Sequence, residues 1–265
     1  MTRPFRGLAL ILTVLLAAAC AGQVQTASSL RALDTRLKDT LVQKNVYESD
    51  PIFNEVALNA ALAAIAEEAV GQARETPEAS SKVALYRIAA IAFWKAGEAG
   101  EGRIVNAVSE GLAACNEAAP RPARDCAVIK LALPFAQTEN EFRKLAILRR
   151  LADVNGGLDG NQFREAEGVL DQMIAATESL LGARPEIENA PVTESFILYL
   201  NRQTKTSFCH AIAAFGFVSA EQVSATNEQG RPARAMSADS RSAFAALAPR
   251  LKAALNIPET ALRQC

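Results

Sequence analysis

The apolar residues of this chain recur at intervals of three and four, and this spacing constrains its fold more than any other feature. Near the start, Leu30, Leu33, Leu37 and Leu41 form one stripe along a helix. Strict apolar–polar alternation, which is typical of half-buried strands, does not occur between turn signals. Alanine, the best helix former, is abundant. We therefore expect an all-α protein.

Proline and glycine divide the helical pattern into segments of moderate length. Pro134 is expected to kink or split the fifth segment, and Gly182 and Pro185 to end the sixth. Short loops between such helices favour stacked antiparallel helical hairpins, as an α-solenoid-like stack or an irregular bundle. The first expected helix begins at residue 26 and ends before the break at Asp50-Pro51. The others cover residues 51–74, 77–96, 103–116, 126–153, 161–181, 192–202, 206–218 and 239–255.

One segment, residues 84–112, pairs an aromatic-containing helix with an alanine-rich one. Tyr86, Ala89, Phe93 and Gly97 lie in the first helix of the pair. In these residues the segment weakly resembles a tetratricopeptide-type hairpin. The small residues of its second helix are out of register with that pattern, and the unit does not recur at a 34-residue period. The resemblance implies a helical hairpin over these residues alone.

The N-terminus has the pattern of an export signal. Arg3 and Arg6 precede a 13-residue apolar stretch, residues 7–19, which is too short to span a bilayer. Ala17, Ala18 and Ala19 then lead to Cys20. This arrangement resembles the lipobox of bacterial lipoproteins, in which a leucine and two small residues precede an acylated cysteine. Here Ala17 stands in the leucine position, because Leu16 lies one place early.

The resemblance implies a chain tethered to a membrane by a lipid on Cys20. Residues 1–19 would be the signal peptide, 20–25 the lipid-bearing cysteine and a short tether, and 26–265 one all-helical domain. Ala21, which is not Asp, implies transport to the outer membrane, with the body facing the periplasm. The alternative is cleavage by an ordinary signal peptidase, leaving a soluble protein with a thiol at Cys20.

The number of cysteines agrees with lipidation. The chain has five, and acylation of Cys20 leaves an even set for the oxidising envelope. Cys115 and Cys126 flank a ten-residue loop that contains two prolines, so we favour a local disulfide there and a second between Cys209 and Cys265. Four cysteines allow three pairings, and the sequence alone does not choose among them. The set lacks CxxC spacing and a histidine cluster, so we expect no metal site and no cofactor.

The charge balance argues against nucleic acid as a partner. Removing Arg3 and Arg6 from the 28 basic residues leaves 26 against 29 acidic ones, a net charge of −3. Phosphate binding requires a basic excess, and base stacking requires aromatic residues, which make up only 6% of the chain.

Two residues raise the question of catalysis. His210, the only histidine, directly follows Cys209. Neighbouring helical side chains point about 100° apart, so this pair does not form a thiol–base couple, and we expect His210 at the edge of the core. Glu194 and Ser195 resemble the Glu-Ser start of the lytic transglycosylase motif, but Ile197 and Leu198 follow where that family has a Gly-Leu-Met-Gln segment. We therefore assign no catalytic residue.

The favoured hypothesis is a protein-binding scaffold or accessory factor of the cell envelope. Phe93 and Trp94 are candidate partner-binding aromatics, with core packing as the alternative. A second hypothesis is a peptidoglycan-lytic enzyme using Glu194, which requires a buried acid in a sugar-sized cleft. The third is a structural lipoprotein without a small-molecule site. The sequence names neither the partner nor the oligomeric state.

Overall fold

A computed structural model of the chain describes residues 27–45, 55–225, 229–231 and 233–255. Most of these residues are helical, and no strand occurs among them. Cys20, the residues expected to form the signal peptide and tether, and Cys265 lie outside the described residues. No described helix is both long enough and apolar enough to cross a membrane.

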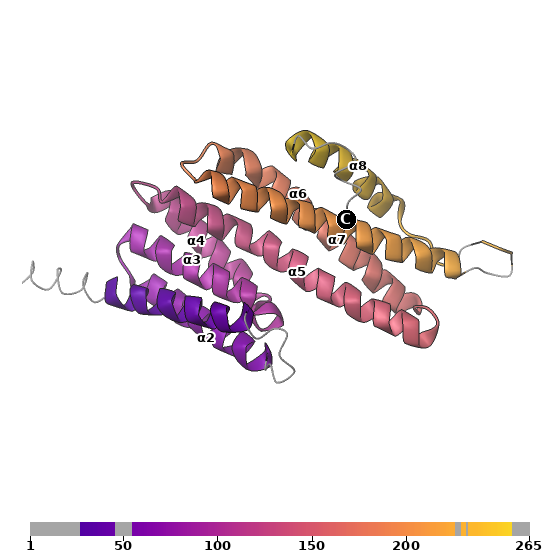
Figure 1. Cartoon of the computed structure of the whole chain (residues 1–265), viewed down its shortest axis with the longest axis horizontal. Helices are drawn as coiled ribbons and strands as arrows, with labels where there is room; N and C mark the ends of the chain where they lie inside the picture. Colours follow the sequence, from indigo (N-terminus) through magenta and orange to yellow (C-terminus); the bar gives the residue numbers. More distant parts are fainter. Residues whose placement is uncertain (1–26, 46–54, 226–228, 232, 256–265) are drawn as a thin grey trace, which may run out of the picture. The chain divides into compact units, whose positions relative to one another are not determined.

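A helix over residues 27–45 is followed by seven α-helices and one short 3₁₀ helix, with α5 the longest (Figure 1). Their bounds are α2 Glu55–Glu75, α3 Ala79–Lys95, η1 Gly97–Gly100, α4 Arg103–Glu117, α5 Ala123–Asn155, α6 Gly160–Glu188, α7 Glu194–Ser224 and α8 Ala238–Leu255. The chain divides into two compact units, Met1–Ile129 and Lys130–Cys265. The boundary falls inside α5.

In the first unit, α3 is the central helix and packs against both α2 and α4. Its apolar residues occur on several faces, which is typical of a helix that has neighbours around it. Its buried side chains are Val83, Leu85, Tyr86, Ile88, Ala89, Ala90, Ala92, Phe93 and Trp94. The turn after α3 needs glycine at position 100, where a Cβ would lie 2.1 Å from the carbonyl oxygen of Phe93.

Polar side chains tie α2, α3 and α4 together at one edge of this unit. Glu110 of α4 accepts two hydrogen bonds from the Arg74 guanidinium, at 3.0 and 2.7 Å, and one from the Tyr86 hydroxyl at 2.6 Å. Burial, followed by the bond to Glu110, raises the pKa of Tyr86 to about 12. The three groups satisfy one another, so this cluster stabilises the helix packing.

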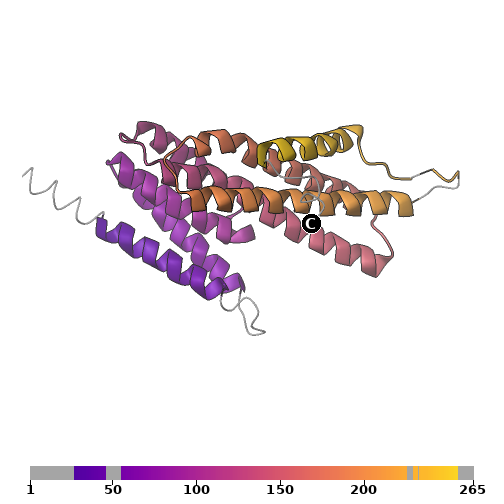
Figure 2. The same cartoon turned by 45° about the horizontal axis from the view of Figure 1, so that its top comes forward.

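The second unit contains α5 from Lys130 onward together with α6, α7 and α8. Helices α6, α7 and α8 pack against one another (Figures 1 and 2). Apolar residues of all four helices form one core, including Leu148, Leu170, Phe208 and Leu247. This core positions the surface residues described below.

Two helices were expected to end where the structure continues them, and α5 was expected to kink or split at Pro134. Helix α5 runs through Pro134, α6 runs through Gly182 and Pro185 to Glu188, and α7 is one helix of 31 residues. In each case the buried stripe continues past the predicted break, and tertiary packing outweighs local propensity. The stripe in α6 includes Leu180, Ala183 and Ile187, and that in α7 includes Leu200, Thr204, Phe208 and Ala211.

Candidate functional site

An aromatic seam runs along the parallel helices α5 and α7 in the second unit. Phe142 of α5 stacks on His210 of α7, with ring centroids 3.8 Å apart and planes 11° from parallel. Two turns earlier on α5, Phe135 meets Tyr199 edge to face at 6.0 Å. We call these four residues the α5–α7 seam. Further along, the Arg149 guanidinium lies 5.7 Å from the Phe217 ring and extends the same row.

The seam lies at the edge of the core: Phe135 is buried and His210 partly buried, whereas Phe142 and Tyr199 reach the surface. Phe142 is 38% exposed and Tyr199 39%, and the neighbouring Leu198 is more exposed still. Amphipathic and aromatic side chains held in this way are enriched at protein–protein interfaces, where they anchor the partner. Because Phe142 is fixed by its stack on His210, it loses little conformational freedom on binding.

Burial sets the electrostatics of the seam. Removal of its imidazole from water lowers the pKa of His210, and the charge of Glu139 opposes this effect. Burial and then Glu139 raise the pKa of Tyr199. The Nδ1 atom of His210 is buried and makes no hydrogen bond with a described residue. His210 is therefore neutral at pH 7 and contributes mainly as an aromatic ring.

Among the described residues, neither Glu194 nor the Cys209–His210 pair lies in the surroundings that catalysis would require. Glu194 is exposed in the first turn of α7, whereas the lytic hypothesis requires a buried acid. Cys209 and His210 are successive residues of one helix, and the ring of His210 faces Phe142. In the part of the chain that the structure describes, no group of three His, Cys, Asp or Glu side chains is placed to hold a metal ion.

The two aromatics expected to bind a partner are buried. Phe93 and Trp94 both lie among the core residues of the first unit, which corresponds to the core-packing alternative. Cations cover part of their rings: the Lys95 ammonium lies 3.9 Å from the Trp94 centroid, and the Arg103 guanidinium lies 5.6 Å from that of Phe93. Neither ring is therefore available as a binding surface.

Only one of the two predicted disulfides has both of its cysteines within the described residues. Cys115 at the end of α4 and Cys126 at the start of α5 form a disulfide, with Cα atoms 5.9 Å apart. It closes the neck of the α4–α5 hairpin, as the spacing predicts. Cys209 lies in α7, but Cys265 is outside the described residues, so their pairing remains a prediction.

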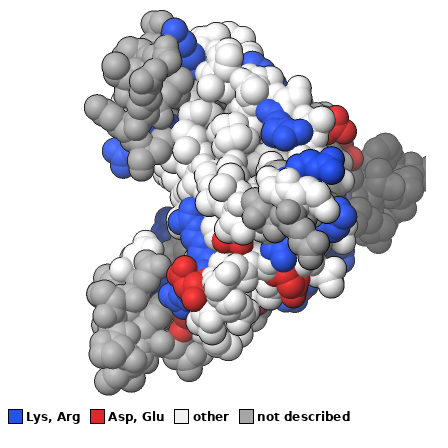
Figure 3. Space-filling model, turned by 90° about the vertical axis from the view of Figure 1, so that its right-hand side faces the viewer, with Lys and Arg blue, Asp and Glu red and all other residues white. Residues whose placement is uncertain are grey.

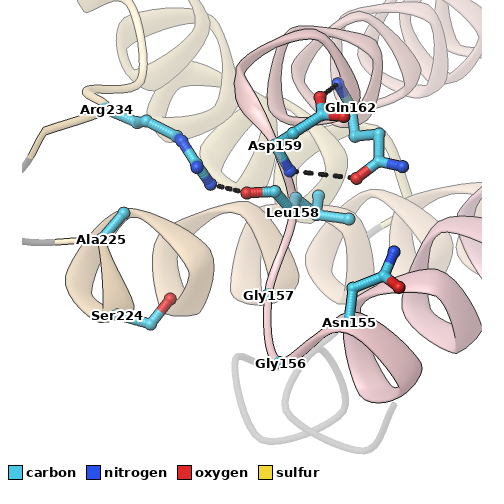
Figure 4. A pocket seen from close by; sticks show the side chains of 9 residues that line it. All are labelled: Asn155, Gly156, Gly157, Leu158, Asp159, Gln162, Ser224, Ala225 and Arg234. Atoms are coloured by element: carbon cyan, nitrogen blue, oxygen red, sulfur yellow. Dashed lines mark hydrogen bonds between the residues drawn. The ribbon is translucent and has the colours of Figure 1, made fainter.

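A polar hollow of about 430 Å³ lies at the end of the second unit, between the α5–α6 turn and the end of α7 (Figure 4). Its lining residues are Asn155, Gly156, Gly157, Leu158, Asp159, Gln162, Ser224, Ala225 and Arg234. Gly156 and Gly157 have positive φ angles, 71° and 133°, which explains the glycine pair in this turn. A second hollow of about 380 Å³ shares Arg234.

Hydrogen bonds within the chain occupy the main polar groups of this hollow. The Glu221 carboxylate accepts from the Leu158 amide at 2.8 Å, and Arg234 donates to the Leu158 carbonyl. Asp159 and Gln162 form a capping box at the start of α6. Acidic and basic side chains are also interspersed across the face viewed in Figure 3, beside broad uncharged areas. The polar groups that line the hollow therefore stabilise the α5–α6 turn. Its lining includes both an acidic and a basic residue, so it has no excess of one charge that would attract an ionic ligand.

Sequence reasoning identified His210 but not the seam around it. The available signal was the seven-residue spacing of Phe135 and Phe142, which places both on one face of α5. Their partners on α7 could not be assigned while α7 was interpreted as two helices.

Comparison of the chain with protein-family models, with curated proteins and with solved structures found no match.

Proposed function

We propose that this chain is a lipid-anchored protein of the bacterial cell envelope that binds another envelope protein through the α5–α7 seam. It acts as a scaffold or accessory factor, held by a lipid on Cys20 at the outer membrane and facing the periplasm. The export-type N-terminus supports the location. The exposed, pre-ordered aromatics of the seam carry the binding role.

The seam fits a protein partner better than a small molecule. Its rings line neither of the two hollows described above, whereas small-molecule sites are concave and enclose most of the ligand. Single exposed apolar residues are common on proteins and need no partner to explain them. A structural lipoprotein without a partner would, however, have no need for both Phe142 and Tyr199 at its surface.

Cross-linking followed by purification from intact envelopes tests this proposal. The native chain is compared with Cys20→Ser, which removes the tether, and with Tyr199→Ser, which removes one of the exposed rings of the seam. We expect a defined set of envelope proteins with the native chain and a clear loss with both variants. Equal recovery from all three, or none from the native chain, would refute the proposal.

The outcome also separates the remaining hypotheses. If no protein is recovered and peptidoglycan fragments accumulate in a Glu194-dependent way, the lytic hypothesis replaces the scaffold. If neither occurs, and membrane fractionation still places the chain in the envelope, the structural role remains.

A further inference from the structure

A lysine at the end of the first helix is buried beside an amide and a carboxylate. Lys44 lies in the helix over residues 27–45 and is only 7% exposed. Its Nζ atom donates to Oδ1 of Asn59 at 2.7 Å and to the Lys95 carbonyl at 2.8 Å. Oε1 of Glu55 lies 3.6 Å from the same Nζ atom. Lysine is rarely buried to this extent, so the arrangement calls for an explanation.

The ends of three helices bring these groups together. Lys44 lies in the last turn of its helix, and Lys95 is the last residue of α3, where helix carbonyls lack partners within the helix. Glu55 and Asn59 are four residues apart at the start of α2, so they share one face of that helix. All four residues belong to the first compact unit. The packing within one unit therefore sets the distances among them.

The contact between Lys44 and Asn59 brings an amine close to an amide carbonyl. An ammonium group only donates hydrogen bonds, so the Asn59 atom that it contacts is the oxygen, and the bond polarises the carbonyl. The carbonyl carbon is one C=O bond, about 1.2 Å, from that oxygen. A small rotation of the lysine side chain therefore brings Nζ to about 3–3.5 Å from this carbon, the separation from which reacting atoms can combine.

Burial favours reaction between these two groups over simple pairing. A charged ammonium that is removed from water is costly, whereas the amide that would replace it is neutral. Two reactants held in one fold also avoid the entropy cost of meeting in solution. The Nδ2 atom of Asn59 is not among the buried polar atoms and makes no hydrogen bond with a described residue. Ammonia released from it can therefore pass directly into water.

Glu55 is placed to move the protons that such a reaction requires. Its carboxylate is the acidic group paired with the Lys44 ammonium, and its side chain is 46% exposed. A carboxylate at this position can take a proton from Nζ and pass it on to the departing nitrogen. The exposed side also lets it exchange protons with water.

We propose that Lys44 and Asn59 become joined by an isopeptide bond within the chain, with Glu55 carrying the proton. Nζ attacks Cγ of Asn59, the Nζ–Cγ bond forms, and the Cγ–Nδ2 bond breaks. Of the two protons that the ammonium group loses, one completes the leaving ammonia, and the other converts it to ammonium in water. No electrons are transferred, so no oxidant or cofactor is needed.

The bond would fasten the first helix to α2. The same two helices are also connected by the ion pair between Arg36 and Glu68, at 2.7 Å. The first helix directly follows the segment that carries the proposed tether, so the bond would hold the folded body to its anchored end. This inference goes beyond the proposed function and does not depend on the α5–α7 seam.

Peptide mapping of the full native chain, purified from envelopes, tests the proposal. The protein is denatured, reduced and digested with a protease that cuts after glutamate. Glu48 lies between Lys44 and Asn59 in the sequence, so this cut separates the two residues unless another bond joins them. We expect the two fragments to stay joined in most molecules, with a mass below their sum by one molecule of ammonia. Fragment sequencing by mass spectrometry should locate the link at Lys44 and Asn59.

Two glutamate variants test the part played by Glu55. In Glu55→Gln, we expect bond formation to slow about a hundredfold or more, so that the fragments separate in protein collected at the same time. Glu68→Gln is the matched control, because it removes the acidic partner of the other ion pair between the same helices. Its fragments should stay joined as in the native chain. Circular dichroism of both variants verifies that the helices are retained.

The possible results separate clearly. Complete separation of the fragments from the native chain would overturn the proposal, because no covalent bond would then exist. Fragments that stay joined without the loss of ammonia would overturn it as well. Equal linkage in Glu55→Gln and the native chain would refute the role of Glu55. Linkage that is lost in Glu55→Gln and retained in Glu68→Gln would support the proposal in full.

Discussion

At the scale of single residues, burial explains most of the chemistry of this molecule. His210 is an example: its Nδ1 atom has no described hydrogen-bond partner, and desolvation lowers its pKa. A second example is a set of three hydroxyls in the core of the second unit. Ser207 lies 3.0 Å from the Thr138 hydroxyl and 2.7 Å from that of Thr177. In both cases the sequence shows the residue but not its surroundings.

The lowered pKa of His210 predicts how stability depends on pH. The folded state binds the proton less readily than the unfolded state, whose histidine titrates near ~6.5. This contribution is complete above that value and is lost as pH falls below it. We expect His210→Phe, which keeps a ring stacked on Phe142, to weaken the loss of stability between pH 7 and pH 5. Urea unfolding across this range measures the effect, and parallel profiles for the two proteins would contradict it.

The hydroxyl cluster predicts a cost for removing Ser207. The Thr138 and Thr177 hydroxyls each donate to the carbonyl four residues earlier, on Pro134 and Met173, and Ser207 joins the two threonines. Because both threonine protons go to these carbonyls, the Ser207 hydroxyl donates to one threonine at a time. Ser207→Ala should lower the free energy of unfolding by about 1–2 kcal/mol, because it removes this buried hydrogen bond. Ser179→Ala on the exposed side of α6 is the control and should have little effect. Equal changes in denaturation midpoint would show that the cluster contributes nothing specific.

At the scale of helices, close approach and chain closure determine the packing. Helix α4 can lie against α3 because position 111 has no side chain: a Cβ there would be 2.9 Å from the Tyr86 Cβ. The adjoining α4–α5 neck is closed by the Cys115–Cys126 disulfide. Each feature gives a stability prediction with a matched comparison in the same chain.

Gly111→Ala should destabilise the protein by about 1–3 kcal/mol, since the added methyl group has no room at the helix crossing. At Gly71 in α2 and Gly182 in α6, an added methyl group would have nothing within 4 Å, so alanine there should stabilise the helix. The expected gain is up to about 1 kcal/mol at each site. Thermal unfolding of the three variants makes the comparison. A stabilised Gly111→Ala variant would show that α3 and α4 separate readily.

Removing the disulfide should lower the free energy of unfolding by about 3 kcal/mol, because the bond limits the freedom of the unfolded chain. Chemical denaturation of the Cys115→Ala, Cys126→Ala double variant measures this loss. Peptide mapping without reduction provides the accompanying check and also tests the predicted Cys209–Cys265 link. A midpoint unchanged by the double substitution would show that other contacts hold the hairpin neck.

At the scale of the whole molecule, local patterns predicted the fold class, and the errors came from breaks that tertiary contacts override. The three-and-four spacing of apolar residues is a property of each helix, so the all-helical fold and the α4–α5 hairpin were predictable. Pro134 was expected to kink or split α5, and residues 203–205 to join two helices, because the packing that continues α5 and α7 involves residues distant in the sequence. The boundary between the two compact units, which falls inside α5, also depends on long-range contacts that the local pattern does not show.

The candidate site was predictable only in part for the same reason. His210 is conspicuous as the single histidine, but its stack on Phe142 joins residues 68 positions apart on two helices. Phe93 and Trp94 are conspicuous as neighbouring aromatics, yet α3 is surrounded by other helices and both rings are buried. Aromatic content alone does not distinguish a central helix from one at the surface.

The most direct test of the central claim, a protein-binding seam on an envelope-anchored chain, is site-specific photo-cross-linking in intact cells. A photoreactive residue replaces Tyr199 in the seam or, as the control, Lys252 on the exposed side of α8. We expect a discrete protein adduct at position 199, dependent on Cys20, and none at position 252. Equal labelling at the two positions, or no protein adduct at position 199, would contradict it.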